Sequence, residues 1–257
     1  MSFPGADHPR EYPDEPGHKF YAESMIREGV ARYKLAALLV KDRDVLDVAC
    51  GSGYGPEILA AAGARSVYAV DKDPEAIEYC EGHFKRSTVK YRVLDARRLA
   101  FVDESFDVVV NHGSLQYNEP EDQERVVREL MRVLRPNGVA VVSVNYNTYT
   151  GPDRTGAHPY HVWAYDSPGL AALLRKRFFF VAIIGQYHVP ETIGFMMLSE
   201  RAEERKTGLM TAGAGQTTLI GIAAKDPLAL ETARETLGPY VRGERVVDLS
   251  PTWRGAV

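Results

Sequence analysis

Cysteine is scarce in this chain of 257 residues, which contains only Cys50 and Cys80. Their spacing does not fit a metal site, and no cluster of histidines and acids accompanies them. We therefore expect no bound metal, and we expect two reduced thiols that pack inside a protein of the cytoplasm.

Long apolar runs and basic runs are missing as well. No stretch approaches the ~18 apolar residues that a helix needs to cross a bilayer. The first 17 residues are acidic and rich in proline without an apolar core, so we expect a flexible segment there and no signal peptide. The 35 acidic residues outnumber the 31 basic ones, for a net charge of −4, so neither nucleic acid nor an anionic membrane is an expected partner.

The most informative stretch is residues 44–71, which read DVLDVACGSGYGPEILAAAGARSVYAVD. The pattern predicts a buried strand, a glycine-rich turn, a helix and a second strand, over 45–49, 51–55, 56–62 and 66–70. Glycines let the backbone approach a ligand closely, and an acid about 20 residues further on, here Asp71, can bind ribose hydroxyls. The stretch therefore predicts a nucleoside-binding unit.

The third glycine of the dinucleotide fingerprint G-x-G-x-x-G is absent, because Pro56 stands at its position. The glycines are instead Gly51, Gly53 and Gly55, and the acid Asp47 precedes them. A pyrophosphate needs N–H donors without a nearby acid, whereas a ligand with an amino group and a sulfonium tolerates one. The loop therefore favours S-adenosylmethionine over NAD, which leaves a nicotinamide oxidoreductase as the disfavoured alternative.

VLDVACGSGYG resembles motif I of the class I S-adenosylmethionine-dependent methyltransferases, of the small-molecule type with domains similar to methyltransferase domains 11 and 25. SFD at 105–107 and LRPNG at 134–138 resemble further junctions of the family. The resemblance implies an α/β fold, namely a Rossmann-like doubly wound seven-stranded sheet that is mostly parallel with an antiparallel last strand. We expect this domain over 18–224, with acceptor-side loops and an insertion over 145–218 and a C-terminal helix and tail over 225–257.

The resemblance also implies which residues bind the cofactor. Asp71 would hold the ribose, Asp95 and the backbone of Ala96 would recognise adenine, and Lys72 stands where the family usually has an apolar residue against the ring. The full predicted set is Asp47, Ala49, Gly51, Gly53, Tyr54, Asp71, Lys72, Asp95, Ala96 and Asn111. Asp73 is expected to cap the next helix instead.

Methyl transfer needs alignment and exclusion of water more than it needs activation, because a sulfonium methyl is already electrophilic. A base is needed only for an acceptor that is protonated at neutral pH. The candidates are His112, at the end of the fourth predicted strand, and His158 and His161, in the loop after the fifth, with His112 and His161 as the predicted catalytic residues. The alternative for each is a structural histidine. Tyr33, in the helical stretch 18–40, could contact the ligand, because the segment before the first strand often covers the cofactor in the family, but we expect it to pack or to face solvent.

We predict an enzyme that transfers a methyl group to an oxygen or nitrogen atom of a small-molecule acceptor, such as a sugar-containing metabolite, and forms S-adenosylhomocysteine. The alternative is a protein of the same fold that binds S-adenosylmethionine without turnover, as a regulatory partner. Both share the predicted cofactor residues, and three histidines on the expected acceptor side favour catalysis.

Overall fold

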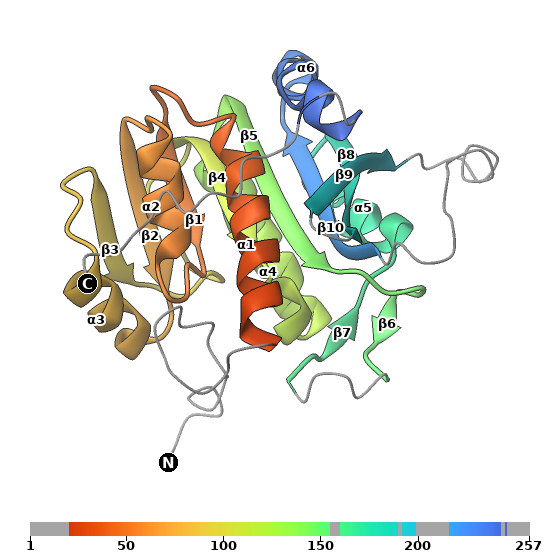
Figure 1. Cartoon of the computed structure of the whole chain (residues 1–257), viewed down its shortest axis with the longest axis horizontal. Helices are drawn as coiled ribbons and strands as arrows, with labels where there is room; N and C mark the ends of the chain where they lie inside the picture. The colour runs from red at the N-terminus through yellow and green to blue at the C-terminus, as the bar shows by residue number, and fades with distance from the viewer. Residues whose placement is uncertain (1–20, 155–159, 190–191, 199–215, 243–244, 246–257) are drawn as a thin grey trace.

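The computed structural model describes residues 21–154, 160–189, 192–198, 216–242 and 245. In this part of the chain one eight-stranded sheet, in the order β3-β2-β1-β4-β5-β10-β8-β9, carries helices on both faces (Figure 1). Its strands are β1 (Asp44–Val48), β2 (Ser66–Asp71), β3 (Val89–Val93), β4 (Phe106–His112), β5 (Leu134–Asn145), β8 (Phe180–Val189), β9 (Thr192–Leu198) and β10 (Gln216–Ala224).

The directions of the strands confirm the predicted sheet. β1 pairs in parallel with β2 and β4, β2 pairs with β3, and β4 pairs with β5. β10 then runs antiparallel between β5 and β8. The strand order reverses beside β1, so the carboxyl ends of β1 and β4 meet at the crevice where open α/β sheets bind ligands.

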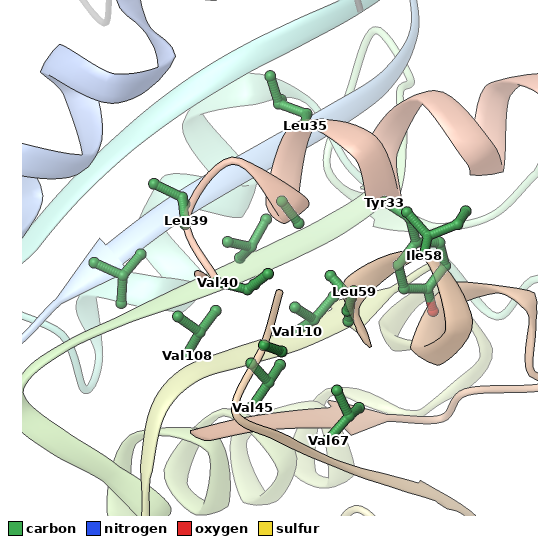
Figure 2. Packing of buried hydrophobic residues seen from close by; sticks show 14 of the residues in the cluster. Tyr33, Leu35, Leu39, Val40, Val45, Ile58, Leu59, Val67, Val108 and Val110 are labelled. Atoms are coloured by element: carbon green, nitrogen blue, oxygen red, sulfur yellow. The ribbon is translucent and has the colours of Figure 1, made fainter. Parts of the chain in front are cut away.

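Helices cover both faces of the sheet. They are α1 (Tyr21–Ala37), α2 (Tyr54–Ala61), α3 (Pro74–His83), α4 (Pro120–Val133), α5 (Ser167–Arg175) and α6 (Pro227–Val241). One apolar cluster joins α1, α2 and α6 to alternate strand residues such as Val45, Val108 and Val110 (Figure 2). A second cluster joins α4 and α5 to the opposite face. Because successive strand residues point to opposite faces, β1, β2, β4, β5, β8 and β10 each contribute to both clusters.

Aspartate caps mark the starts of α3 and α5, and the cap of α3 is the one that the sequence predicts. Asp73 caps α3, where its Oδ1 accepts from the backbone N–H of Glu75 at 2.8 Å, and Pro74 follows as the first helical residue. Asp166 caps α5 in the same way, through the N–H of Gly169. These caps satisfy N–H groups that have no partner inside the helix.

The second half of the sheet differs from the sequence prediction. We predicted an irregular insertion over 186–218, but β8 extends to Val189 and pairs with β9, an eighth strand. LRPNG at 134–138 is the start of β5, with a shift of register against β4, and not only a turn. The predicted flexible segment 1–17, His158 and residues 199–215 of the predicted insertion lie outside the described residues.

The two edges of the parallel strands differ in chemistry. At the amino edge, Asp44 and Asp107 both form ion pairs with Arg65 and Arg135, at 2.6 to 3.3 Å. The carboxyl edge carries the predicted site, together with a 3₁₀ helix, η1 (Leu115–Tyr117), and a short ribbon of β6 (Gly151–Pro152) and β7 (Trp163–Ala164). None of the helices in the described ranges combines the length and apolar character of a membrane span.

Candidate cofactor and acceptor site

The loop between β1 and α2 is a left-handed turn. Ala49, Gly51 and Gly53 have φ of 61°, 54° and 84°. The backbone N–H of Cys50 donates to the carbonyl of Val70 on β2 at 3.0 Å, which holds the loop against the neighbouring strand. Gly53 stands at the start of α2 without a side-chain cap, so the first N–H groups of this helix have no capping side chain.

Two glycines of the loop make room for specific neighbours. A Cβ on Gly53 would lie 2.5 Å from the Sγ of Cys80. A Cβ on Gly55 would lie 2.1 Å from the ring of Tyr33 on α1. The third glycine of G-x-G-x-G thus allows Tyr33 to pack over the end of β1.

Asp47, near the end of β1, is fully buried beneath Tyr33. The Tyr33 hydroxyl donates to its Oδ1 at 3.2 Å, and its Oδ2 is buried without a hydrogen-bond donor among the described residues. Burial raises the pKa of Asp47 to about 8, the Tyr33 hydrogen bond offsets part of this, and the negative charge of Asp71 adds to it. This unsatisfied oxygen fits a ligand that brings a cationic amino group.

Asp71, at the tip of β2, faces the same loop. Its Oδ2 accepts from the backbone N–H of Gly51 at 3.0 Å, and its Oδ1 accepts from that of Asp73 at 3.0 Å. These two bonds fix the carboxylate beside the glycine loop. The predicted ribose residue and the glycine loop are therefore brought together.

The predicted adenine residues lie beyond β3. Asp95 accepts from the backbone N–H of Arg97 at 2.8 Å and from its guanidinium at 2.5 to 3.0 Å. This guanidinium lowers the pKa of Asp95, and it also contacts Asp122 on α4. Ala96 is half-buried against the core, and Lys72 is exposed. The sequence alone did not pair Asp95 with Arg97.

Asn111 and Tyr54 are held by the protein itself. The amide of Asn111 is fully buried and donates to the carbonyl of Val48 at 2.9 Å and to Ser114 Oγ at 2.7 Å, so it ties β4 to the end of β1. Tyr54 is buried and meets the ring of Tyr33 edge-on, with centroids 5.5 Å apart.

His112 ends β4 under α1. Its Nδ1 lies 3.0 Å from Ser143 Oγ on β5, and its ring meets that of Tyr33 at 4.8 Å. Its Nε2 is buried without a hydrogen-bond partner among the described residues. Burial, and then the guanidinium of Arg32, hold the pKa of His112 well below 6.5, so the ring is neutral at pH 7.

His161 lies beside Asp153, in the chain that links β6 to β7. Its Nδ1 is 3.5 Å from Asp153 Oδ2, and its ring packs on that of Tyr117 in η1. The backbone N–H of Val162 donates to the carbonyl of Gln116 at 2.8 Å, which fixes this segment over the end of β4. Sequence reasoning singled out His161 but missed Asp153, since nothing local in the sequence joins them.

Fold and site together define a class of protein. The strand order with its reversed β10, the glycine loop after β1 and the acid at the tip of β2 are those of a Rossmann-like α/β fold.

Comparison with known proteins agrees with this class. Residues 46–142 match the family model described as "Methyltransferase domain". The chain is 37% identical over 150 residues, 58% of its length, to a protein of Mycobacterium tuberculosis named "Probable S-adenosylmethionine-dependent methyltransferase". A Mycolicibacterium smegmatis protein with the same description is 33% identical over 158 residues, 61% of this chain and 60% of that protein. Residues 46–142 of the chain thus match a methyltransferase domain, and both relatives are described as S-adenosylmethionine-dependent methyltransferases.

Solved structures share the fold. A Burkholderia thailandensis 1,6-didemethyltoxoflavin-N1-methyltransferase, bound to 1,6-didemethyltoxoflavin and S-adenosylhomocysteine, aligns with a TM-score of 0.56 at 21% identity, over 79% of this chain and 82% of that chain. The PH0226 protein of Pyrococcus horikoshii aligns with a TM-score of 0.55 at 21% identity, over 79% of this chain and 92% of that chain. Among the curated relatives, the alignment spans 53% of the M. tuberculosis protein, about half of its length.

Proposed function

We propose that this protein is a methyltransferase that uses S-adenosylmethionine and transfers its methyl group to a small-molecule acceptor. The observation that carries the proposal is the convergence of Asp47 and Asp71 on one left-handed glycine loop. When bound, the cofactor supplies an electrophilic methyl group on sulfur.

Different residues of the protein bind different parts of the cofactor. Asp71 accepts hydrogen bonds from the ribose, and the loop backbone lies along the nucleoside because its glycines carry no Cβ. Asp47 Oδ2 receives the amino group of the methionine part, which satisfies its open position. Asp95, Ala96 and Lys72 form the adenine end, and Ala49, Gly51, Gly53, Tyr54 and Asn111 shape the wall.

The acceptor lies on the far side of the loop, where His112 and His161 reach the carboxyl edge. We assign the base to His161, because Asp153 Oδ2 lies 3.5 Å from its Nδ1 and can hold the imidazole in place while the ring takes a proton from an acceptor oxygen or nitrogen. His112 is enclosed by Tyr33 and Ser143, which favours a positioning role.

Calorimetric titration tests the cofactor assignment. We expect S-adenosylhomocysteine to bind and NAD not to bind. Asp71→Asn weakens this affinity by at least about tenfold, because a charge-assisted hydrogen bond contributes roughly 1.5–3 kcal/mol. Asp73→Asn is the matched control, since Asn still caps α3. Binding of NAD alone would overturn the proposal.

Label transfer from methyl-labelled S-adenosylmethionine into small-molecule extracts tests turnover. We expect transfer by the native protein, and loss of transfer with retained S-adenosylhomocysteine binding in His161→Asn. Tight binding without transfer to any acceptor would favour the second candidate, a binding protein without turnover.

A further inference from the structure

Polar side chains replace the apolar core where four strands end beneath α1. On this face, Val108 and Val110 of β4, Val141 of β5, Ile220 and Ile222 of β10 and Ile184 of β8 belong to the apolar cluster. Further along the same face, at the carboxyl edge of β4 and β5, each of the four strands carries a polar residue instead. These residues are His112, Ser143, Thr218 and Gln186, and we call them the polar row. His112 pairs with Ser143, and Thr218 pairs with Gln186.

The polar row is deeply enclosed. Ser143 and Gln186 are 0% exposed and Thr218 is 2% exposed. Asn145 pairs with Thr218 and is exposed, so the row reaches the surface at this edge. Tyr33 contacts His112 and also donates to Asp47, so the row adjoins the cofactor loop.

Arg32 of α1 adds a positive charge above the row. Its Nη1 donates to Thr218 Oγ1 at 3.2 Å, and its Nε is buried without an acceptor among the described residues. It forms no ion pair with a carboxylate in the part of the chain that the structure describes. A buried cationic N–H without an acceptor is costly, and the Nε edge of a guanidinium matches a carboxylate side-on.

Gln186 has a buried acceptor that lacks a hydrogen-bond donor. Its Nε2 donates to the carbonyl of Glu28, one turn before Arg32 in α1, at 3.3 Å. Its Oε1 is buried without a donor among the described residues. The row therefore lacks one anionic acceptor at Arg32 and one hydrogen-bond donor at Gln186. Because it offers a single cation, it suits a singly charged carboxylate better than a phosphate dianion.

We infer that the polar row with Arg32 binds a methyl acceptor that is a carboxylic acid bearing a hydroxyl or amino group. The carboxylate takes the Nε edge of the Arg32 guanidinium, and a hydroxyl or amino group other than the one that is methylated donates to Gln186 Oε1. This assignment rests on the proposed function, because it places the acid beside the cofactor loop.

Matched pairs of acid and amide test the inference on protein saturated with S-adenosylhomocysteine. The probes are 3-hydroxybenzoate with 3-hydroxybenzamide, and lactate with lactamide, titrated by calorimetry. We expect at least one acid to bind about tenfold or more tightly than its amide, the size of a charge-assisted hydrogen bond. Arg32→Gln brings the pair to within about twofold of each other, and Arg32→Lys restores part of the preference.

Two further variants complete the test. Arg125→Gln removes an exposed arginine elsewhere, so it leaves the preference for the acid intact. Gln186→Leu lowers the preference for 3-hydroxybenzoate over benzoate without changing the preference for acid over amide. Equal affinity of acids and amides for the native protein, or a preference that survives Arg32→Gln, would show that the row holds only solvent. Failure of S-adenosylhomocysteine to bind would count against the proposed function instead.

Discussion

At the scale of single residues, the role proposed for Asp47 predicts that cofactor binding depends on pH. Its pKa of about 8 means that the carboxyl group is largely protonated at pH 7 in the free protein. An ammonium group binds the carboxylate form, so binding at Oδ2 must release this proton. The burial that creates the site therefore also opposes its occupation at low pH.

We accordingly expect the affinity for S-adenosylhomocysteine to rise as the pH rises from 6 to 8. The rise levels off above about 8, where Asp47 is already ionised. Calorimetry in buffers of different ionisation enthalpy measures the released proton. Asp47→Asn binds more weakly and without this pH dependence, and an equally steep dependence in that variant would contradict the assignment.

The same carboxyl group makes the folded protein less stable as the pH rises, although the affinity for the cofactor rises. In the unfolded chain an aspartate titrates near 3.9, and in the folded protein at about 8, so the folded state holds the extra proton between these values. Its contribution to the free energy of unfolding therefore falls as pH rises from about 4 to about 8. Without cofactor, we expect Asp47→Asn to be more stable than the native protein at pH 8 and to lose that advantage towards pH 4, as measured by urea unfolding.

At the scale of elements, the loop between β1 and α2 is constrained by α3. Gly53 faces Cys80 and Phe84 of that helix and its cap, whereas a Cβ on Gly51 meets no atom within 4 Å. Both have positive φ. A comparison of substitutions at the two positions therefore distinguishes the energy of the backbone conformation from the energy of a steric collision.

Alanine at each position should show the difference. Gly51→Ala lowers the free energy of unfolding by roughly 1–2 kcal/mol, because only the left-handed backbone is unfavourable for alanine. In Gly53→Ala the new Cβ also collides with Cys80 Sγ, so we expect the free energy of unfolding to fall by at least about 1 kcal/mol more. Adding Cys80→Ala to Gly53→Ala recovers part of the loss. Equal losses for the two single variants would contradict the packing described for α3.

The sequence predicts the elements of the cofactor half better than those of the acceptor half. Motif I, the two apolar strand segments and the acid at position 71 all lie within 28 consecutive residues, so a short-range pattern is enough to predict these elements. The contact of Arg32 with Thr218 joins residues that are 186 positions apart, and no local sequence pattern predicts it. β9 escaped prediction because its pairing with β8 depends on tertiary context rather than on a clear alternation.

At the scale of the whole molecule, a network of stabilising ion pairs lies at one edge of the sheet and the candidate binding site lies at the opposite edge. Asp44 and Asp107 share Arg65 and Arg135 at the amino edge, while the polar row and the glycine loop occupy the carboxyl edge. The hydrogen bond from Arg65 is the main cause that lowers the pKa of Asp44. The stabilisation from this charge is therefore present above about pH 4, where unfolded aspartate is ionised, and is lost as the pH falls further.

Arg135→Met tests the separation. Because Arg135 bridges both aspartates, at 3.2 and 2.7 Å, we expect a loss of about 1 kcal/mol in the free energy of unfolding at pH 7 and low salt. The loss shrinks at high salt and below pH 4, and the affinity for S-adenosylhomocysteine is unchanged. Arg125→Met, which breaks only an exposed pair within α4, serves as control. A large change in cofactor affinity would show that the edges are coupled.

The close fit of Gly55 to the ring of Tyr33 has a consequence for engineering. Position 33 on α1 and position 55 at the start of α2 fit each other closely, so a larger residue at position 55 requires a smaller one at position 33. A chimaera that imports residues 44–71 into another scaffold must also import a tyrosine from the preceding helix, or Asp47 would be left uncovered and open to solvent.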